Sequence, residues 1–586
     1  DGMATSAQIA FFDLAYTDEY GDVLMAATPN MDSAYYQVAH DAGARIHSDS
    51  WGYDVFEYDA ETKEIDQYAR DTPDFLPFFA AGNSGDYGLG SITTPAGGKN
   101  MLSIGASKSP RSWDAYIPPD WEYYNVNIAS ELHRFSYHFS HLKIILLQAA
   151  DFGLDWDSTS KEYATVARSV IHAKPEEGCS ALSNDVDQRI ALIKRGTCPF
   201  ETKARNAYNA GAIGVLIYNS EYDTDLQNPN GYKIHMGRSK SDYPQAFNSA
   251  AVGFITHRDG LILKALSERS TGIKVTFSRY TRTNMDLGFE DVAYFSSAGP
   301  FGPDNYDLRI KPDIIAPGDE IKSAANNNVC GTAYSSGTSM ACPIAAGGTA
   351  LVQEYFEKGY YPGGFPGSGA NRAPSGSLLK AIVINGATAM TGIDEEYLEP
   401  LEQPPSFKQG WGRLNLTNSL HFDDIPESPK VMYIRDNKEL SASNNHTDGF
   451  CLDVDSYYDK FELRVTLVWA DVADERLVND LDLELHFGSN YTGMSKILPL
   501  DGLEDHTNNV ERIIYSNPEQ GRYWVNVKKY GNFGSGSGSI QKYAVVATGT
   551  FTHMEGKTYD ECALDNPPPP PSPPPASPPK PPPSPP

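Results

Sequence analysis

Short apolar runs separated by turn residues mark the first hundred positions of the chain. The runs at 9–14, 44–52 and 76–81 are typical of buried strands. Strands that alternate with helices favour a parallel sheet, in which functional side chains gather beyond the carboxyl ends of the strands. Two of these strands end in small and polar residues, at 50–52 and 82–85, so we expect a site at that edge of the sheet.

The α/β pattern continues in a second part of the chain. Apolar residues at helical spacing predict a helix over 31–44, and a further strand is expected at 311–315. Ser339 begins a helix rich in alanine and glycine, and such small residues suit close packing inside a core. The long interruption at 109–285 has its own strand–helix–strand pattern over 189–218, which indicates an inserted α/β domain.

Residues 424–555 follow a different pattern. Apolar and polar residues alternate within 461–469, 481–487 and 523–527, and turn clusters separate these runs. The alternation predicts an antiparallel β-sandwich. The predicted organisation has five parts: an α/β domain in two segments, 1–108 and 286–422, an insertion at 109–285, a β-sandwich at 423–556 and a proline-rich tail at 557–586.

Charge and composition narrow the classes of function. The 586 residues include 76 acidic and 47 basic side chains, a net charge of −29. Binding to nucleic acid needs a basic face, so we expect no nucleic-acid partner. No apolar run approaches the roughly 20 residues that span a bilayer, so no membrane partner is expected. The tail is nearly pure proline and predicts an extended polyproline II segment.

Cysteines and glycosylation acceptors bear on the compartment. None of the six cysteines has the spacing of a zinc site, and their disulfide connectivity stays open. Three N-x-S/T acceptors are present, at Asn415, Asn445 and Asn490. Together with the acidic balance and the tail, they favour a secreted glycoprotein.

Ser339 and Asn83 are the candidate catalytic residues. A serine in the first turn of a buried helix lies at the positive end of the helix dipole, and Gly337 beside it lets a substrate backbone approach. The alternative is an ordinary serine N-cap. Asn83 follows a strand and is placed to aim its amide N–H at a developing oxyanion, with a simple Gly-Asn turn as the alternative. The segment 50–52 suits pairing with an extended peptide.

Four motifs occur in the order found in subtilisin-like serine peptidases, and the chain resembles that family. The motifs are Ser-Trp-Gly at 50–52, Ala-Ala-Gly-Asn-Ser-Gly at 80–85, Lys-Pro-Asp with Ala-Pro-Gly at 311–318, and Gly-Thr-Ser-Met-Ala at 337–341. The resemblance implies acyl transfer by Ser339 without a catalytic cofactor, with Asn83 and the backbone N–H of Ser339 holding the oxyanion. It further implies two walls of a substrate pocket, formed by Ser50, Trp51 and Gly52 and by Ala80, Ala81 and Gly82.

The catalytic aspartate and histidine of that family find no match in this chain. In subtilases both precede a strand that this chain presents at 2–9, so the sequence is interpreted as an N-terminally truncated peptidase, inactive as it stands. Two alternatives stay open: one half of a two-chain enzyme, and a degenerate, non-catalytic relative. Neither His40 nor His47 has a sequence position that would bring it to Ser339.

Within the insertion, residues from about 157 to 280 resemble a protease-associated domain. The resemblance rests on Cys179, on the strand and turn at 189–200 and on the segment 207–218. In that family the domain lies beside the active site and binds peptide or limits access; a packing module without a ligand is the alternative. Cys179 and Cys198 flank one strand and its turn, which favours a disulfide between them.

The C-terminal block resembles the jelly-roll domain of one subtilase branch, through 460–471, 477–483 and 508–511. It contains a group of hard oxygen ligands that suits calcium, with carboxylates that cap turns as the alternative. The candidate calcium ligands are Asp471, Asp480, Asp482, Asn508 and Glu511.

The remaining cysteines carry weaker expectations. Cys451 and Cys562 bracket the C-terminal block, and a disulfide between them would tie its ends. Cys342 lies one helical turn past Ser339 and is expected to be a small buried hydrophobe, with a pairing to Cys330 as the alternative.

The Ser-Pro-Pro-Pro units of the tail resemble hydroxyproline-rich segments of green-algal wall proteins. This resemblance implies a subtilase that digests a mother-cell or sporangial wall and associates with the cell wall through its tail. The sequence therefore predicts a secreted serine endopeptidase with protein or peptide substrates. The rival hypothesis is a wall-associated binding protein built on a degenerate subtilase shell.

Overall fold

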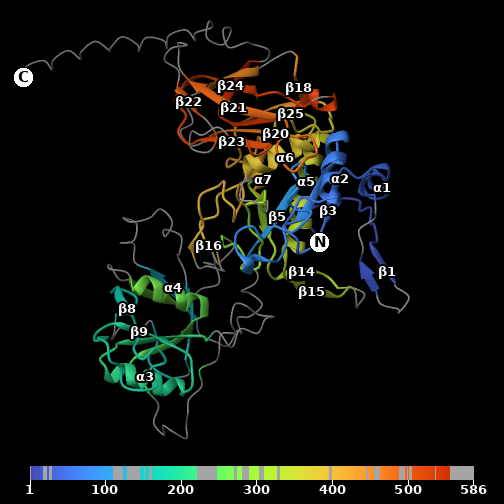
Figure 1. The fold of residues 1–586 in the computed structure, drawn as a ribbon. Coiled ribbons are helices and arrows are strands. Elements are labelled where there is room, and N and C mark those ends of the chain that lie inside the picture. The colour runs from blue at the N-terminus through green and yellow to red at the C-terminus, as the bar shows by residue number, and fades with distance from the viewer. Residues whose placement is uncertain are drawn as a thin grey trace, which may run out of the picture.

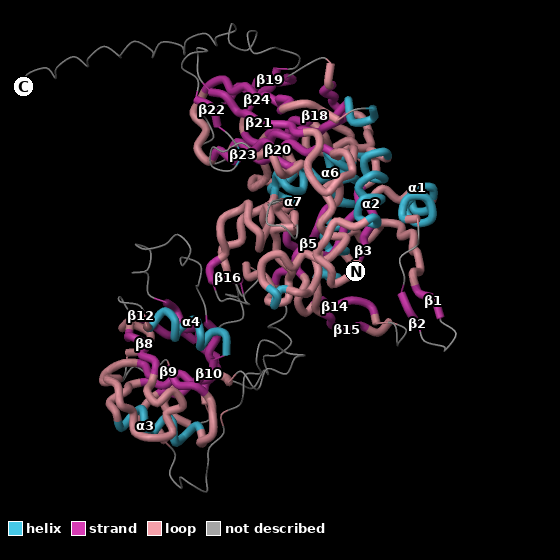
Figure 2. The backbone as a smooth tube through the Cα atoms, viewed as in Figure 1, coloured by secondary structure: helices cyan, strands magenta, loops and turns pink. Residues whose placement is uncertain are grey.

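The computed structural model divides into three regions, drawn as a ribbon in Figure 1 and by secondary structure in Figure 2. The residues that the structure describes are 2–17, 23–25, 30–109, 123–128, 145–150, 152–156, 162–220, 236, 247–255, 257–268, 273–279, 290–301, 309–325, 330–394, 399–443, 447–454, 462–487, 495–497, 499, 505–534 and 536–554. The predicted proline-rich tail lies outside them, as do Asn445 and Asn490.

A four-stranded parallel sheet forms the centre of the first region, in the order β13-β5-β4-β3. The strands and main helices are β3 Ile46–Asp49, β4 Leu76–Ala80, β5 Leu102–Ser107, β13 Ile314–Pro317, α2 Ala60–Asp71, α5 Thr338–Glu357 and α6 Gly376–Gly386. Successive side chains of a strand point to opposite faces. In β4, Phe78 and Ala80 pack with α5 and α6, whereas Phe79 packs with α2. Helices therefore cover both faces of the sheet, as parallel strands require.

Short elements surround this sheet. The helix predicted over 31–44 is present as a π-helical turn, Met31–Tyr36, followed by α1. The short elements are α1 Gln37–Asp41, α7 Leu416–Ser419, and the strand pairs β1 Ala15–Thr17 with β2 Val23–Met25, β14 Ile321–Ala324 with β15 Thr332–Ser335, and β16 Ile393–Asp394 with β17 Glu399–Pro400.

The run at 9–14 is not a buried strand, and that prediction is wrong. Ile9 is 87% exposed and Phe11 is 86% exposed, while Phe12 packs edge-on against Tyr35 with 4.9 Å between ring centroids. In the described sheet β3 is the edge strand and pairs with β4 alone. A strand needs a neighbour's backbone groups as well as apolar side chains, and this run joins no ladder.

The insertion forms a closed barrel with the strand order β10-β11-β7-β6-β12-β8-β9. Its elements are β6 Tyr123–Ile128, β7 Ile145–Ala149, β8 Arg168–His172, β9 Ile190–Lys194, α3 Phe200–Asn209, β10 Gly214–Tyr218, β11 Ala251–Ile255, α4 His257–Ser267 and β12 Ile273–Arg279. In β9, Ile190 and Leu192 pack in the cluster that includes α4, whereas Ala191 and Ile193 pack with α3. The barrel therefore has two apolar clusters, one on each side of β9.

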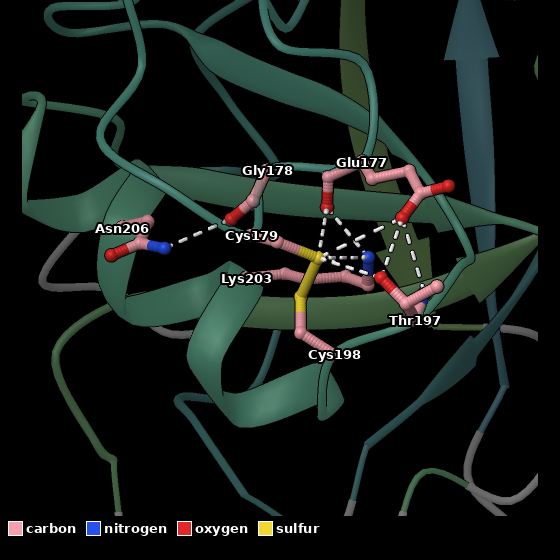
Figure 3. The surroundings of a disulfide bond; sticks show 7 residues. All are labelled: Glu177, Gly178, Cys179, Thr197, Cys198, Lys203 and Asn206. Atoms are coloured by element: carbon pink, nitrogen blue, oxygen red, sulfur yellow. Dashed lines mark hydrogen bonds between the residues drawn. A yellow bond between two sulfur atoms is a disulfide. The ribbon is translucent and has the colours of Figure 1, made fainter.

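A disulfide joins Cys179 to Cys198, with their Cα atoms 5.7 Å apart (Figure 3). The Thr197 backbone N–H and hydroxyl both donate to the Glu177 carboxylate at 3.1 Å, and Lys203 of α3 donates to the Glu177 carbonyl. The segment 177–179 is thus fixed to the turn after β9 by the disulfide and the Thr197 hydrogen bonds, and to α3 by Lys203.

The other cysteines are placed as follows. Cys330 is exposed and Cys342 is buried, and both are free thiols, so the suggested pairing between them is wrong. Cys451 is disulfide-bonded. Cys562, its predicted partner, lies outside the described residues.

The third region consists of two antiparallel sheets, ordered β18-β25-β20-β23 and β22-β21-β24-β19-β26. The strands are β18 Val431–Ser441, β19 Thr447–Val454, β20 Leu463–Trp469, β21 Asp480–Phe487, β22 Ser495–Ile497, β23 Val510–Tyr515, β24 Gly521–Tyr530, β25 Ile540–Gly549 and β26 Phe551–Met554. One apolar cluster takes residues from both sheets, among them Leu467 of β20 and Leu483 of β21. In Figure 1 these strands lie against α6.

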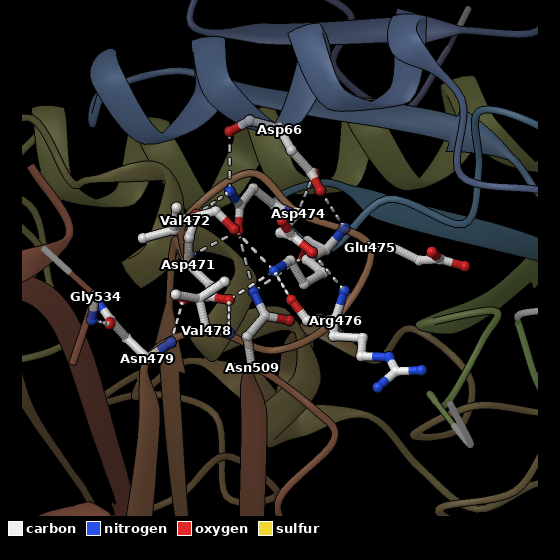
Figure 4. Close-up of polar contacts among 12 residues, drawn as sticks. Asp66, Asp471, Val472, Asp474, Glu475, Arg476, Val478, Asn479, Asn509 and Gly534 are labelled. Atoms are coloured by element: carbon white, nitrogen blue, oxygen red, sulfur yellow. Dashed lines mark hydrogen bonds and ion pairs between the residues drawn. The ribbon is translucent and has the colours of Figure 1, made fainter. Parts of the chain in front are cut away.

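A buried ion pair joins the first and third regions (Figure 4). Lys99 Nζ lies 2.6 Å from Asp471 Oδ2, and both side chains are 0% exposed. Lys99 also donates to the carbonyl groups of Val472 and Arg476, and Asn100 exchanges hydrogen bonds with the backbone of Asp471. A buried charge is tolerated when its hydrogen bonds are satisfied, as they are here. Among the described helices none combines the length and apolarity needed to cross a membrane.

Candidate active site

Ser339 lies in the first turn of α5, beside the carboxyl end of β3. Its Oγ donates to the Ser50 carbonyl at 3.4 Å, and Ser50 Oγ donates to the Ser339 carbonyl at 2.9 Å. Gly337 precedes the helix with φ +152°, and a Cβ there would lie 3.4 Å from Asn83 Nδ2. Glycine suits this close approach of backbone and side chain. The structure thus brings together Ser339, Asn83 and the strand end at 50–52.

Asn83 follows β4 and is oriented by Thr338. Its Oδ1 accepts hydrogen bonds from the Thr338 backbone N–H at 2.8 Å and from the Thr338 hydroxyl at 3.0 Å. The same hydroxyl accepts a hydrogen bond from the Gly82 N–H at 3.2 Å. Because Oδ1 takes both donors of Thr338, the orientation of the Asn83 amide, and with it the position of the Nδ2 donors, is fixed.

Ala80, Ala81 and Gly82 continue from β4 and present backbone and small side chains. The Ala81 N–H donates to the Ile104 carbonyl, and the Ala81 carbonyl accepts from the Thr93 N–H, both at 3.0 Å. Gly82 has φ +110°, and a Cβ there would lie 2.5 Å from the Thr93 side chain. Only glycine fits this position, so the segment is held rigidly against β5 and Thr93.

Asp49, the residue before the strand end at 50–52, holds this segment in place through hydrogen bonds. The sequence analysis did not identify Asp49 as part of the site. The buried Asp49 carboxylate accepts hydrogen bonds from Tyr35 at 2.6 Å, Tyr36 at 3.2 Å, His47 Nδ1 at 2.9 Å and Trp51 Nε1 at 3.0 Å. Burial raises the pKa of both tyrosine hydroxyls, so they remain donors at any physiological pH. The sequence offered one indication of this role: Asp49 is a charged residue directly before the Ser-Trp-Gly motif.

No histidine among the described residues hydrogen-bonds to Ser339 Oγ. His47 packs against Tyr35 and Tyr36, with ring centroids 4.8 and 4.9 Å apart. Ser48 and Ser50 face α5 instead, because neighbouring residues of a strand point to opposite faces. His47 therefore faces away from the serine. His40 pairs with Asp74 at 3.1 Å.

Cys342 lies one turn past Ser339 on α5. It is fully buried, and its Sγ lies 3.6 Å from Ser48 Oγ. Burial raises the pKa of the thiol to about 12, so it stays protonated at neutral pH. A protonated, buried thiol is a poor nucleophile and acts here as a small packing group.

Residues 1–412 match the Subtilase family, peptidase S8. The chain belongs to the subtilase family. The serine protease/ABC transporter B family protein tagD of Dictyostelium discoideum is 27% identical to this subtilase over 581 residues, covering 88% of the chain and 25% of that protein. The C5a peptidase of Streptococcus pyogenes is 31% identical over 284 residues, covering 48% of the chain and 20% of that protein. This subtilase thus spans a quarter or less of the length of these relatives.

The matched residues include both Asn83 and Ser339. Among solved structures, the psychrophilic subtilisin-like protease Apa1 from Pseudoalteromonas sp. AS-11 aligns over 67% of this chain and 72% of its own. The two proteins are 14% identical in this alignment, with a TM-score of 0.24.

Two of the predicted calcium ligands of this subtilase are engaged elsewhere. Asp471 is the partner of Lys99 and also accepts the backbone N–H groups of Val478 and Asn479. Asn508 Oδ1 accepts from the Ile310 N–H at 2.8 Å, and its Nδ2 donates to Asp505. Both side chains thus use oxygens in contacts with protein groups, and their role as calcium ligands stays a prediction.

Two of the other three predicted ligands, Asp480 and Asp482, lie close to His506, which the sequence did not single out. Ligand atoms of Asp480, Asp482 and His506 lie within 4.8 Å of one another. Burial raises the pKa of Asp480 to about 7. Burial also raises the pKa of Glu511 well above its usual range, and the nearby charges of Asp505 and the two strand aspartates add to this rise. In the sequence, only the short separation of Asp505 and His506 from Glu511 indicated that they lie near the predicted ligands.

Asn415, the one described glycosylation acceptor, caps helix α7. Its Oδ1 accepts from the Asn418 N–H at 3.2 Å, and its Nδ2 donates to Thr388 at 3.0 Å. An amide used in this way is a poor acceptor for a glycan in the folded chain.

Proposed function

We propose that this chain carries the nucleophile and the oxyanion hole of a secreted serine endopeptidase. The observation that carries the proposal is the arrangement at the start of α5. Ser339 Oγ meets the strand end at Ser50, and Asn83 is held so that its amide N–H groups are free for an oxyanion. These are the parts that acyl transfer requires, apart from a general base.

In the proposed mechanism a histidine takes the proton from Ser339 Oγ as the oxygen attacks the carbonyl carbon of a peptide bond. The oxyanion that forms is stabilised by Asn83 Nδ2 and by the Ser339 backbone N–H. The same histidine then gives its proton to the leaving amine, and an acyl-enzyme remains on Ser339. Water hydrolyses this ester and restores the serine.

We propose that the general base is a histidine other than His40 and His47. Support comes from His47, which faces away from Ser339, and from His40, which pairs with Asp74 at 3.1 Å.

The other regions are assigned accessory roles. The barrel over 123–279 is interpreted as a protease-associated domain, supported by its α/β composition and its disulfide. The two C-terminal sheets are interpreted as a jelly-roll domain, supported by their antiparallel strands and shared core. The acidic charge and proline-rich tail support an extracellular, wall-associated protein.

Labelling with a fluorophosphonate probe tests the proposal. This chain should react slowly, because no histidine among the described residues lies beside Ser339 to act as its base. Ser339→Ala should abolish the remaining labelling and leave the melting temperature unchanged. A chain that binds peptides but never labels would favour the non-catalytic binding protein.

A further inference from the structure

The two proposed substrate walls, 50–52 and 80–82, converge on one residue, Thr93. A Cβ added at Gly82 would lie 2.5 Å from Thr93 Cγ2, and one added at Gly52 would lie 3.3 Å from Thr93 Oγ1. Thr93 is buried, and its backbone N–H and its hydroxyl both donate to a carbonyl of the second wall, at 3.0 and 3.2 Å. A substrate side chain that enters between the walls therefore meets this threonine at their far end.

The segments that follow the two walls contact each other at two places. Ser84, the residue after Asn83, donates its hydroxyl to Asp54 Oδ1 at 3.0 Å. Beside this contact the rings of Phe56 and Tyr87 pack with their centroids 6.2 Å apart. The Asp54 carboxylate therefore lies where the loop after the first wall meets the turn after the second, and its partner Ser84 is the neighbour of the proposed oxyanion donor.

The loop that presents Asp54 is fixed on both sides of this residue by Thr94. The Tyr53 N–H donates to the Thr94 carbonyl, and the Thr94 N–H donates to the Val55 carbonyl, both at 2.8 Å. The Thr94 hydroxyl also donates to the Glu57 carbonyl at 2.6 Å. The carboxylate is thus held in position before a substrate binds, which lowers the entropy lost on binding.

The charge around the two walls is negative. Asp54, Glu57 and Asp86 are exposed, and within the described part of the chain none of them pairs with a basic side chain. Lysine, arginine and histidine are absent from the sequence of the walls, of the segments that follow them and of the first turn of α5: 48–62, 80–98 and 336–342. A surface of one sign concentrates ligands of the opposite sign, so this edge attracts cationic substrates.

We infer that Asp54 selects a lysine or arginine at P1, the substrate residue directly before the scissile bond; the inference rests on the proposed peptidase function. The Ser84 hydroxyl uses Oδ1 of the carboxylate, and the ammonium or guanidinium group of the substrate binds the other oxygen. An apolar P1 side chain would take water from the carboxylate without replacing its hydrogen bonds, and an acidic one would be repelled. The substrate class is therefore proteins cleaved after basic residues.

Peptidyl phosphonates that differ only at P1 test the inference on the full chain. The norleucine analogue has the aliphatic part of lysine without its charge. Ser339 should be labelled roughly fivefold faster by the lysine analogue, the upper end for an ion pair that water still reaches, and slowest by the glutamate analogue. Asp54→Asn should remove the preference for lysine over norleucine. Because the amide oxygen of the new side chain still accepts from Ser84, the loop keeps its geometry.

Glu57→Gln is the matched control, since it removes the same charge from the same loop and leaves the contact with Ser84. It should keep the lysine preference. The inference is overturned if the parent chain reacts equally with the lysine and norleucine analogues, or if Glu57→Gln loses the preference as completely as Asp54→Asn, which would assign it to the general negative field.

A second measurement separates this inference from the proposed function. Failure of a simple fluorophosphonate to label Ser339 counts against the peptidase function alone. If neither phosphonate labels the chain, fluorescence anisotropy of the matching unreactive peptides decides the selectivity. Tighter binding of the lysine peptide that Asp54→Asn abolishes supports the inference. Equal binding of the lysine and norleucine peptides, or no binding of either, overturns it.

Discussion

Thr338 connects three parts of the active site through one hydroxyl group. The hydroxyl accepts the Gly82 N–H and donates to Asn83 Oδ1, while the Thr338 backbone N–H donates to the same oxygen. The first N–H groups of a helix have no partner within it, so Asn83 also caps α5. The proposed oxyanion donor, Asn83, is therefore oriented by the helix that carries the proposed nucleophile, Ser339, and the side chain of Thr338 is a positioning group.

Substitutions of Asn83 and Thr338 should lower kcat in a catalytically active form of the protein. Asn83→Ala should lower kcat by roughly 10²–10³-fold, the usual cost of one oxyanion donor. Thr338→Val keeps the shape and removes one neutral hydrogen bond, worth about 1 kcal/mol, so kcat should fall by several fold. KM should change little in both, because substrate pairing at 50–52 is untouched. Steady-state kinetics on an extended peptide measures both constants.

Thr338→Ser is the matched control, since it keeps the hydroxyl and loses the methyl group. It should retain most of the activity that Thr338→Val loses. If the serine variant were as slow as the valine variant, packing of the methyl group would explain the effect. A rise in KM at constant kcat in Asn83→Ala would remove Asn83 from the oxyanion hole.

At the scale of elements, local patterning predicted the strands that lie inside sheets. β4, β10 and β21 appear where apolar runs or alternation indicated, because burial on a sheet imposes those patterns directly. The run at 9–14 has the same pattern and forms no strand, since pairing depends on a neighbour distant in sequence. The roles of Asp49 and His506 were not predicted for a related reason. Each contacts a residue of another element, and the pattern of apolar and polar residues does not indicate such contacts.

The disulfide beside α3 gives a prediction for the barrel. Cys179 and Cys198 are 19 residues apart. Closing a loop of that size lowers the conformational entropy of the unfolded chain and so stabilises the folded state by about 3 kcal/mol. In the full chain, Cys179→Ser with Cys198→Ser should therefore accelerate proteolytic cleavage within 162–220 by roughly a hundredfold, if cleavage follows opening. Mass spectrometry of timed digests identifies the cut sites.

The exposed free thiol at Cys330 provides the control for that experiment. Cys330→Ser should leave the cleavage rate of the barrel unchanged, because this residue lies on the hairpin side of the peptidase region and makes no disulfide. Equal cleavage rates in the parent and the double variant would show that the hydrogen bonds of Glu177 and Lys203 hold the turn without the disulfide.

At the scale of the whole molecule, the first and third regions form one folding unit. Lys99 and Asp471 are 372 positions apart in the chain, and their buried ion pair is surrounded by hydrogen bonds from Asn100 and Asn509. Arg70 of α2 adds bonds to the Ala470 and Ile540 carbonyls. The sequence analysis assigned Asp471 as a calcium ligand. Nothing in the sequence around this residue indicates an ion pair with a lysine 372 positions away.

Removing one partner of the Lys99–Asp471 pair should lower the free energy of unfolding. Lys99→Met leaves the Asp471 carboxylate buried without its counter-charge, a change that typically costs about 3–5 kcal/mol. Burial already lowers the pKa of Lys99, and the Asp471 charge opposes that fall, so the ammonium depends on this partner. We expect a clearly lower melting temperature of the full chain by scanning calorimetry. Lys358→Met, which removes an exposed lysine paired with Glu354, should have no measurable effect.

The double variant Lys99→Met with Asp471→Asn decides how the interface is stabilised. If the cost of Lys99→Met comes from an uncompensated charge, neutralising Asp471 should recover part of the lost melting temperature, since the amide oxygen of the new side chain can still accept one backbone N–H. Such recovery would mean that the two regions are matched by charge at their contact. A double variant no more stable than expected from adding the single effects would place the stabilisation in the surrounding backbone contacts of Val472, Arg476 and Asn509 instead.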